Sequence, residues 1–277
     1  MPCFPIGSPV GVVCLDAVFL ESFGMTAIAG NCVAESVVVA ADGRTRVPES
    51  PELTDEIRLR GNLENERKIF LIKDQDKTLV YAGVGYLSAA DDGFSILDEI
   101  KKQKLLLCQR RFETCRDYVQ YLSLKLKAAI RDALKKKTFC VPEDDPLIAR
   151  LLFAGFFRKE MSWVAAEFKY NEGRVKLEVD RCPITPGNMV VLGPPKMWDL
   201  FRAKDARFAE YIKPLGPNST LEEGRDCAKG FIDMCKSPLA AEIEPLCLNV
   251  GGRVHVAAVT PDGFRWLIEP ENPSDED

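Results

Sequence analysis

The chain has 277 residues, of which 46% are hydrophobic and 29% are charged, and its net charge at pH 7 is -5. This balance is typical of a folded globular protein and excludes a disordered chain, a collagen-like repeat and a disulfide-rich miniprotein. It gives no reason to expect nucleic acid or an anionic membrane surface as the main partner.

The amino-terminal stretch is apolar but lacks the features of a secretory signal, because the first basic residue of the chain is Arg44. No segment approaches the roughly 20 uninterrupted apolar residues that span a bilayer. The 10 cysteines contain no Cys-x-x-Cys pair, so we expect reduced, mostly buried thiols rather than a disulfide framework or a metal site. These features predict a soluble protein of the cytosol or nucleus with no membrane partner.

Short runs rich in β-branched and apolar residues predict the strands. In chain order they are 26–33, 36–41, 68–73, 78–84, 149–157, 161–170, 174–179, 188–192, 253–260 and 264–268. The first two are joined at Ala34-Glu35, and a long polar loop at 45–66 follows them. The run 36–41 is apolar on both faces, which is typical of a strand buried between two layers.

Two pairs of helices interrupt the strands. Ser88 is expected to cap a helix that runs to residue 107, and apolar residues at three- and four-residue spacing predict a second helix over 112–136. Two further helices are predicted at 196–212 and 221–236, the latter opened by a capping box of Thr220 and Glu223. No linker divides the chain, so the order predicts one α+β domain, a four-layer αββα sandwich of two antiparallel sheets. Residues 270–277 are expected to form an acidic, disordered tail.

The chemistry available to the chain is limited by its single histidine, His255. This residue lies in an alternating strand and is interpreted as a strand residue rather than a catalytic base. The GxSxG, P-loop and GxGxxG motifs are absent, so no cofactor is expected. One general base needs no imidazole: a free α-amino group titrates near pH 7.7–8.0, within reach of the hydroxyl of its own residue. Such a site requires a Thr, Ser or Cys that becomes the first residue, with an Asp and a Lys nearby.

Several segments carry a family resemblance. They are Thr26-Ala27-Ile28-Ala29-Gly30, Val37 to Arg44, Arg67-Lys68-Ile69-Phe70, Ala82-Gly83, Gly251-Gly252-Arg253-Val254 and Pro261-Asp262-Gly263. In this order they resemble the β-type subunits of the proteasome core, which are N-terminal nucleophile (Ntn) hydrolases. The resemblance implies the same αββα sandwich over residues 26–269, preceded by a prosegment-like leader at 1–25.

The same resemblance implies a role for each matching residue. Thr26 would be the nucleophile once the leader is removed, and its freed amine would be the base. Asp42 would pair with Lys68, and Lys68 would lower the pKa of the amine. Gly83, in a turn after a strand, would donate its backbone N–H to the oxyanion, and Arg44 would support Asp42. The implied reaction is threonine-type cleavage of a polypeptide, and the implied partners are other subunits in a ring.

Four positions differ from the family pattern. Met25 stands where self-cleaving members carry Gly, Pro194 falls at a supporting serine, and Cys247 and Val250 fall at an aspartate and a serine. These side chains cannot make the hydrogen bonds that orient the threonine hydroxyl and amine. Three functions therefore remain open: an active protease, a non-catalytic ring subunit that retains its leader, and a free-standing Ntn amidohydrolase.

Overall fold

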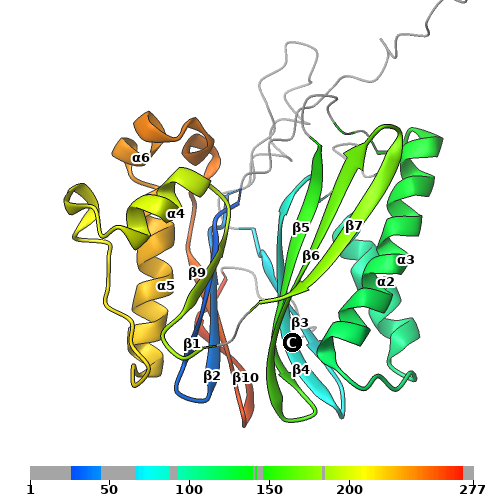
Figure 1. Ribbon diagram of the computed structural model, residues 1–277, viewed down its shortest axis with the longest axis horizontal. Coiled ribbons are helices and arrows are strands. Elements are labelled where there is room, and N and C mark those ends of the chain that lie inside the picture. The colour runs from blue at the N-terminus through cyan, green and yellow to red at the C-terminus, as the bar shows by residue number, and fades with distance from the viewer. Residues whose placement is uncertain are drawn as a thin grey trace, which may run out of the picture.

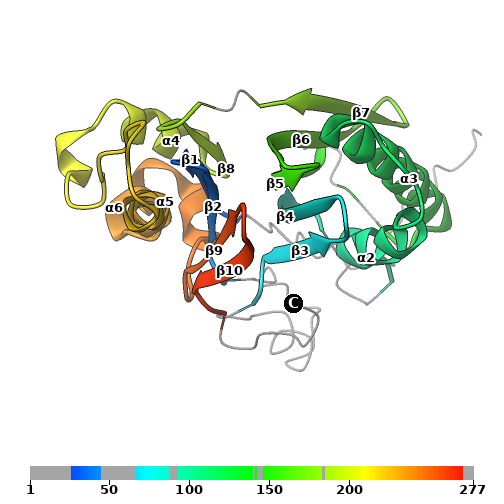
Figure 2. The same cartoon turned by 90° about the horizontal axis from the view of Figure 1, so that it is seen from below.

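Two five-stranded antiparallel sheets face each other, and helices cover the outer face of each, so that the protein has four layers (Figure 1, Figure 2). The computed structural model describes residues 26–44, 66–87, 93–139, 141, 146–182 and 185–270. The predicted leader at 1–25, residues 45–65 of the predicted loop and residues 271–277 of the predicted tail lie outside the described residues. The predicted α+β class and the four-layer αββα sandwich are confirmed.

The first sheet has the strand order β10-β9-β2-β1-β8. Its strands are β1 (Ile28–Val33), β2 (Ser36–Ala41), β8 (Met189–Leu192), β9 (His255–Thr260) and β10 (Gly263–Ile268). β1 and β2 form the predicted hairpin, in which Ala34 takes a positive φ of 47°. The hairpin pairs Ile28 with Ala41, so residues just before β1 lie beside residues just after β2.

The second sheet has the strand order β3-β4-β5-β6-β7, and its strands follow one another in sequence. They are β3 (Ile69–Lys73), β4 (Lys77–Gly85), β5 (Leu147–Phe157), β6 (Glu160–Asn171) and β7 (Arg174–Arg181). The first pair of the β3–β4 ladder joins Ile69 to Ala82. Lys68 therefore lies directly before the first residue of β3.

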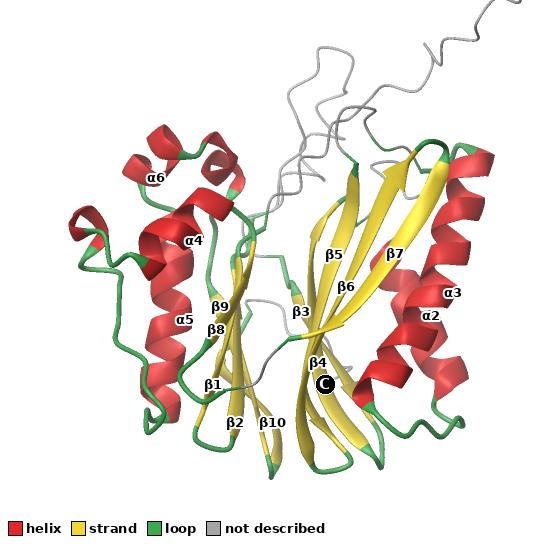
Figure 3. Cartoon of the chain, in the orientation of Figure 1, coloured by secondary structure: helices red, strands yellow, loops and turns green. Residues whose placement is uncertain are grey.

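Helices α2 (Ile96–Leu107) and α3 (Cys115–Lys136) cover the second sheet (Figure 3). The predicted start of the first helix at Ser88 is wrong, and Ser88 itself lies outside the described residues. The helix begins after Ser95, because the Ser95 side chain accepts the backbone N–H of Asp98 and so satisfies a helix donor. Within the described segments, no helix is both long and apolar enough to cross a membrane.

Three helices cover the first sheet: α4 (Pro195–Arg202), α5 (Leu221–Cys235) and α6 (Pro238–Ile243). α5 carries the predicted capping box of Thr220 and Glu223. The predicted helix over 196–212 is too long, because Lys204 takes a left-handed φ of 52° and the Asp205 side chain accepts the N–H of Arg207. α6 was not predicted, because an element this short has too few turns to show a helical period.

Three apolar clusters hold the layers together: one under α2 and α3, one under α4 and α5, and one between the sheets. β2 takes part in two of them, since Val38 faces the helices and Val39 faces the other sheet. This explains why its sequence is apolar on both faces. Trp163 crosses the gap between the sheets and lies so close to Gly30 that a Cβ there would come within 2.4 Å of its ring.

Candidate active site

Thr26 and Asp42 meet at one end of the β1–β2 hairpin. Thr26 lies just before β1, and Asp42 directly follows β2. The Ala27 N–H donates to Asp42 Oδ1 at 3.0 Å, and the Asp42 N–H donates to the Ala27 carbonyl at 3.2 Å. Thr26 is 3% exposed and Asp42 is 0% exposed. The hairpin register therefore places the predicted nucleophile and the predicted aspartate in one buried position.

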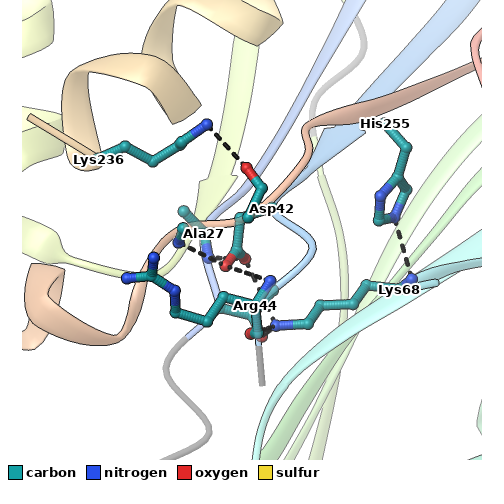
Figure 4. Close-up of polar contacts among 9 residues, drawn as sticks. Ala27, Asp42, Arg44, Lys68, Lys236 and His255 are labelled. Carbon is teal, nitrogen blue, oxygen red and sulfur yellow. Dashed lines mark hydrogen bonds and ion pairs between the residues drawn. The ribbon is translucent and has the colours of Figure 1, made fainter. Parts of the chain in front are cut away.

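Lys68 reaches the same position from the second sheet (Figure 4). Its Nζ atom lies 2.8 Å from Thr26 Oγ1 and 3.6 Å from Asp42 Oδ1, and it also donates to the Arg44 carbonyl. The Lys68 side chain is 9% exposed. A buried ammonium is tolerated only when its charge and its donors have partners: Thr26 Oγ1 and the Arg44 carbonyl accept hydrogen bonds, and Asp42 supplies the opposite charge. The structure thus brings Thr26, Asp42 and Lys68 together.

Opposing influences act on the Asp42 carboxyl group, and burial is the largest, so its pKa lies above the usual value. Burial raises the pKa of Asp42, whereas the Lys68 charge and backbone hydrogen bonds from Gly251, Ala27 and Arg44 act in the opposite direction. Gly251 N–H lies 3.1 Å from Oδ2, and Arg44 N–H lies 3.4 Å from the same atom. All four groups are donors, and donors stabilise the ionised form of a carboxyl group.

Arg44 and the Gly251-Gly252 pair enclose Asp42 from the side. The Gly43 N–H donates to the Gly251 carbonyl at 3.0 Å, and Lys236 Nζ, just after α5, donates to the Gly252 carbonyl at 2.8 Å (Figure 4). The Arg44 guanidinium packs so closely that a Cβ at Gly251 would come within 2.3 Å of its Cζ atom. A side chain at position 251 would displace the Arg44 guanidinium, and Arg44 lies beside Asp42 as predicted.

Gly83 lies inside β4 and not in a turn, so this part of the prediction is wrong: β4 continues to Gly85. The direction of its N–H follows from the ladders, because hydrogen-bonded residues alternate along an antiparallel pair. The Tyr86 N–H donates to the Ile148 carbonyl, so the even-numbered residues of β4 form their backbone hydrogen bonds with β5. Gly83 is odd-numbered and directs its N–H to the opposite side, where the β3–β4 register places Lys68.

The comparisons with known proteins bear on the fold. No protein-family model and no curated protein matches the sequence of the chain. Among solved structures, the chain is similar to Anbu (ancestral beta-subunit) from Yersinia bercovieri. The TM-score is 0.51 and the sequence identity is 15%, over 88% of this chain and 88% of that one. The chain has a proteasome-like fold.

The prediction of a proteasome core β-type subunit is wrong, because the similarity found is to an ancestral β-subunit and, at 15% identity, reaches only the fold. The short segments that carried the prediction include glycines with a packing role in this chain. Gly30 accommodates Trp163, and Gly251 accommodates Arg44. A packing role of this kind bears on the fold and does not identify one branch of it.

Four positions differ from the family pattern, and the structure places one of them next to Thr26. Gly193 takes a φ of +130°, and a Cβ there would come within 2.8 Å of the Thr26 carbonyl oxygen, so the Gly193-Pro194 turn lies against Thr26. Cys247 and Val250 are 3% and 2% exposed and belong to the apolar cluster under α4 and α5. Met25 lies outside the described residues. None of Pro194, Cys247 and Val250 carries a hydroxyl or carboxylate that could orient Thr26.

The main site residue that sequence reasoning missed is His255. Its Nε2 atom accepts the Lys68 backbone N–H at 3.0 Å (Figure 4), and the ring is 1% exposed. The alternating pattern of a strand does not predict which residues of another sheet it contacts. The one feature of the sequence that pointed to His255 was that it is the sole histidine. In the part of the chain that the structure describes, no group of three or more His, Cys, Asp or Glu side chains could hold a metal ion.

Proposed function

We propose that the chain is a threonine-type Ntn hydrolase that cleaves peptide bonds after residues 1–25 have been removed. One observation carries this proposal: Lys68 Nζ contacts both Thr26 Oγ1, at 2.8 Å, and Asp42 Oδ1, at 3.6 Å. A hydroxyl, an ammonium and a carboxylate in a buried cluster at the start of a strand are the groups that an amine-based nucleophile requires.

In the proposed reaction, the freed Thr26 amine accepts the proton of Thr26 Oγ1 through a water molecule. Oγ1 then forms a bond to the carbonyl carbon of the substrate. The Lys68 charge favours the neutral amine, because a nearby like charge disfavours protonation. The Gly83 N–H, which is directed toward Lys68, would stabilise the negative oxygen of the tetrahedral intermediate. The amide nitrogen leaves with the proton, and water hydrolyses the resulting ester.

The test is the amino-terminal sequence and mass of the protein isolated from its own cells, together with labelling by a threonine-directed electrophile. We expect an end at Thr26 and a single covalent adduct that is lost in Thr26→Ala. Thr260→Ala is a matched control, because Thr260 lies in β9 and its hydroxyl accepts the N–H of Asp262 far along the strand. An intact leader would overturn the proposal, since an amide nitrogen cannot act as the base.

A second candidate is a non-catalytic subunit that retains its leader. The apolar character of Pro194, Cys247 and Val250 favours it, because none of these side chains can make the hydrogen bonds that orient the threonine hydroxyl and amine. Assembly with other subunits of this fold, as a ring, is part of both proposals. Native mass spectrometry separates them from a free-standing amidohydrolase, for which we expect a monomer that is nevertheless processed at Thr26.

A further inference from the structure

His255 connects the two sheets at the residue that carries the proposed active-site lysine. It is the first residue of β9 in the first sheet, and it accepts the N–H of Lys68, which precedes β3 in the second sheet. We propose that His255 is a positioning residue: by accepting the Lys68 N–H it opens the β3–β4 ladder at Lys68 and directs the lysine to Thr26. This inference rests on the proposed function.

The ladder geometry shows what His255 replaces. The Asp74 N–H donates to the Lys77 carbonyl at 2.9 Å, so this is a hydrogen-bonded pair of the β3–β4 ladder. Because such pairs alternate and the register is unbroken, Lys68 and Gly83 occupy another hydrogen-bonded position. A regular ladder would join the Lys68 N–H to the Gly83 carbonyl and the Gly83 N–H to the Lys68 carbonyl. The ladder instead begins one residue later, and the Lys68 N–H is donated to His255.

The consequence concerns the direction of the lysine side chain. Along β3, side chains alternate between the two faces of the sheet: Ile69 packs between the sheets, whereas Phe70 and Ile72 pack under α2 and α3. A regular ladder would turn Lys68 to the same face as Phe70 and Ile72, whereas its side chain crosses to Thr26 and Asp42 on the first sheet. The buried acceptor at position 255 therefore releases Lys68 from the alternation of the strand.

The imidazole can accept only while it is neutral, and its surroundings keep it neutral. Burial, followed by the charge of Lys68, lowers the pKa of His255 to about 4, while a hydrogen bond with the Arg253 backbone acts in the opposite direction. The other charged groups that act on the ring are Arg67, before β3, and Arg253, before β9; both are cations. From β10, Trp266 presents an edge at 6.1 Å between ring centroids.

The experiment compares three variants of the full-length chain. His255→Leu removes the acceptor, and His255→Gln retains one, because the Gln Oε1 atom can take the place of Nε2. Val259→Ala is the matched control: Val259 lies on the same face of β9, is 0% exposed and packs between the sheets. The first readout is the crystal structure of each variant. The second is the rate at which processed protein is labelled by a threonine-directed electrophile.

We expect His255→Leu to bring Lys68 into the ladder with Gly83, so that Nζ leaves Thr26 Oγ1, and to slow labelling by about 10- to 100-fold. His255→Gln should keep Nζ at Thr26 and restore most of the rate. Val259→Ala should lower thermal stability without slowing the labelling of folded protein. A His255→Leu protein with Lys68 still at Thr26, or with a rate loss equal to that of Val259→Ala, would overturn the inference.

The single histidine supplies a readout that does not depend on activity. In the proposed geometry the proton is on Nδ1, and the ¹⁵N chemical shift of unprotonated Nε2 in histidine-labelled protein reports this tautomer directly. If wild-type protein shows this tautomer but is never processed at Thr26, the proposed function fails while the structural contact stands. If processed, active protein carries the proton on Nε2, the inference about His255 fails while the proposed function stands.

Discussion

The two sides of Thr26 differ in the chemistry that they offer. On one side, Lys68 and Asp42 form a buried polar cluster in which each group has a partner. On the other, the Gly193-Pro194 turn lies against Thr26, and Cys247 and Val250 belong to the apolar cluster under α4 and α5. The difference has an energetic basis. Removing one member of a buried ion pair leaves an uncompensated charge and costs about 3–5 kcal/mol, whereas a single neutral hydrogen bond is worth about 1 kcal/mol.

Losing one member of a buried pair of charges is therefore costly whether or not the pair is used in catalysis, while hydroxyl groups can be lost singly at little cost. The charged side of Thr26 identifies where the proposed reaction would occur. The apolar residues bear on its proposed rate, and they separate the two functions proposed above.

The largest expected effect comes from removing the charge at Lys68. In Lys68→Met, we expect labelling of processed Thr26 to slow by about 1,000-fold, because the amine loses the cation that favours its neutral form. The matched control is Lys77→Met: Lys77 is also buried, at 7% exposure, and is paired with Asp74 at the far end of β4. Equal rates for the two variants would show that the charged side of Thr26 has no catalytic role.

Asp42→Asn tests the same side through stability. The amide that replaces one carboxylate oxygen would place N–H groups against the donors of Ala27 or Gly251 and would leave Lys68 without its counter-ion. We expect the free energy of unfolding to fall by about 3–5 kcal/mol. The measurement is urea denaturation of the full-length chain.

Asp132→Asn is the comparison for this variant. Asp132 is 57% exposed and pairs with Arg131, which is 58% exposed, so we expect a loss of about 1 kcal/mol or less. A loss in Asp42→Asn no larger than that in Asp132→Asn would remove the distinction between an essential buried pair and a dispensable exposed one.

The same contrast explains what the sequence could predict. The hairpin around Ala34 and the apolar pattern of β2 are local signals, and they are enough to place Thr26 and Asp42 side by side. The four layers followed from the order of the elements. Local patterns could not give the start of α2 at Ser95, because Ser88 offers the same capping chemistry. Nor could they give the contact of His255 with Lys68, which depends on how two sheets pack.

His255 contacts Lys68 and so belongs to the polar side of Thr26. Its contribution to the free energy of unfolding can be measured from the pH dependence of stability. Its pKa is lowered from 6.5 to about 4, first by burial and then by Lys68. The unfolded chain therefore binds the proton more tightly, so this contribution is complete above pH 6.5 and is lost as the pH falls toward 4.

We expect the loss to reach about 3 kcal/mol in the free energy of unfolding, measured by urea denaturation between pH 7 and pH 4. His255→Gln cannot titrate and should lack this part of the slope. The difference between the two proteins isolates His255 from Asp42, whose pKa is raised by burial and whose contribution runs the opposite way. Identical slopes would mean that the imidazole is not held neutral between the sheets.

Val250→Ser changes the apolar side and carries the smallest expected effect. Val250 directly precedes Gly251, whose N–H binds Asp42, and its buried side chain belongs to the apolar cluster under α4 and α5, so Val250→Ser places a hydroxyl one residue from the Asp42 contact. If poor orientation of Thr26 limits the rate, labelling should rise by about 10-fold relative to Val250→Ala, which creates a similar cavity without the hydroxyl. Equal rates for the Ser and Ala variants would mean that a missing hydroxyl at this position does not limit the reaction. Val250 would then not explain a slow or absent activity, and the non-catalytic proposal would rest on Met25, Pro194 and Cys247 alone.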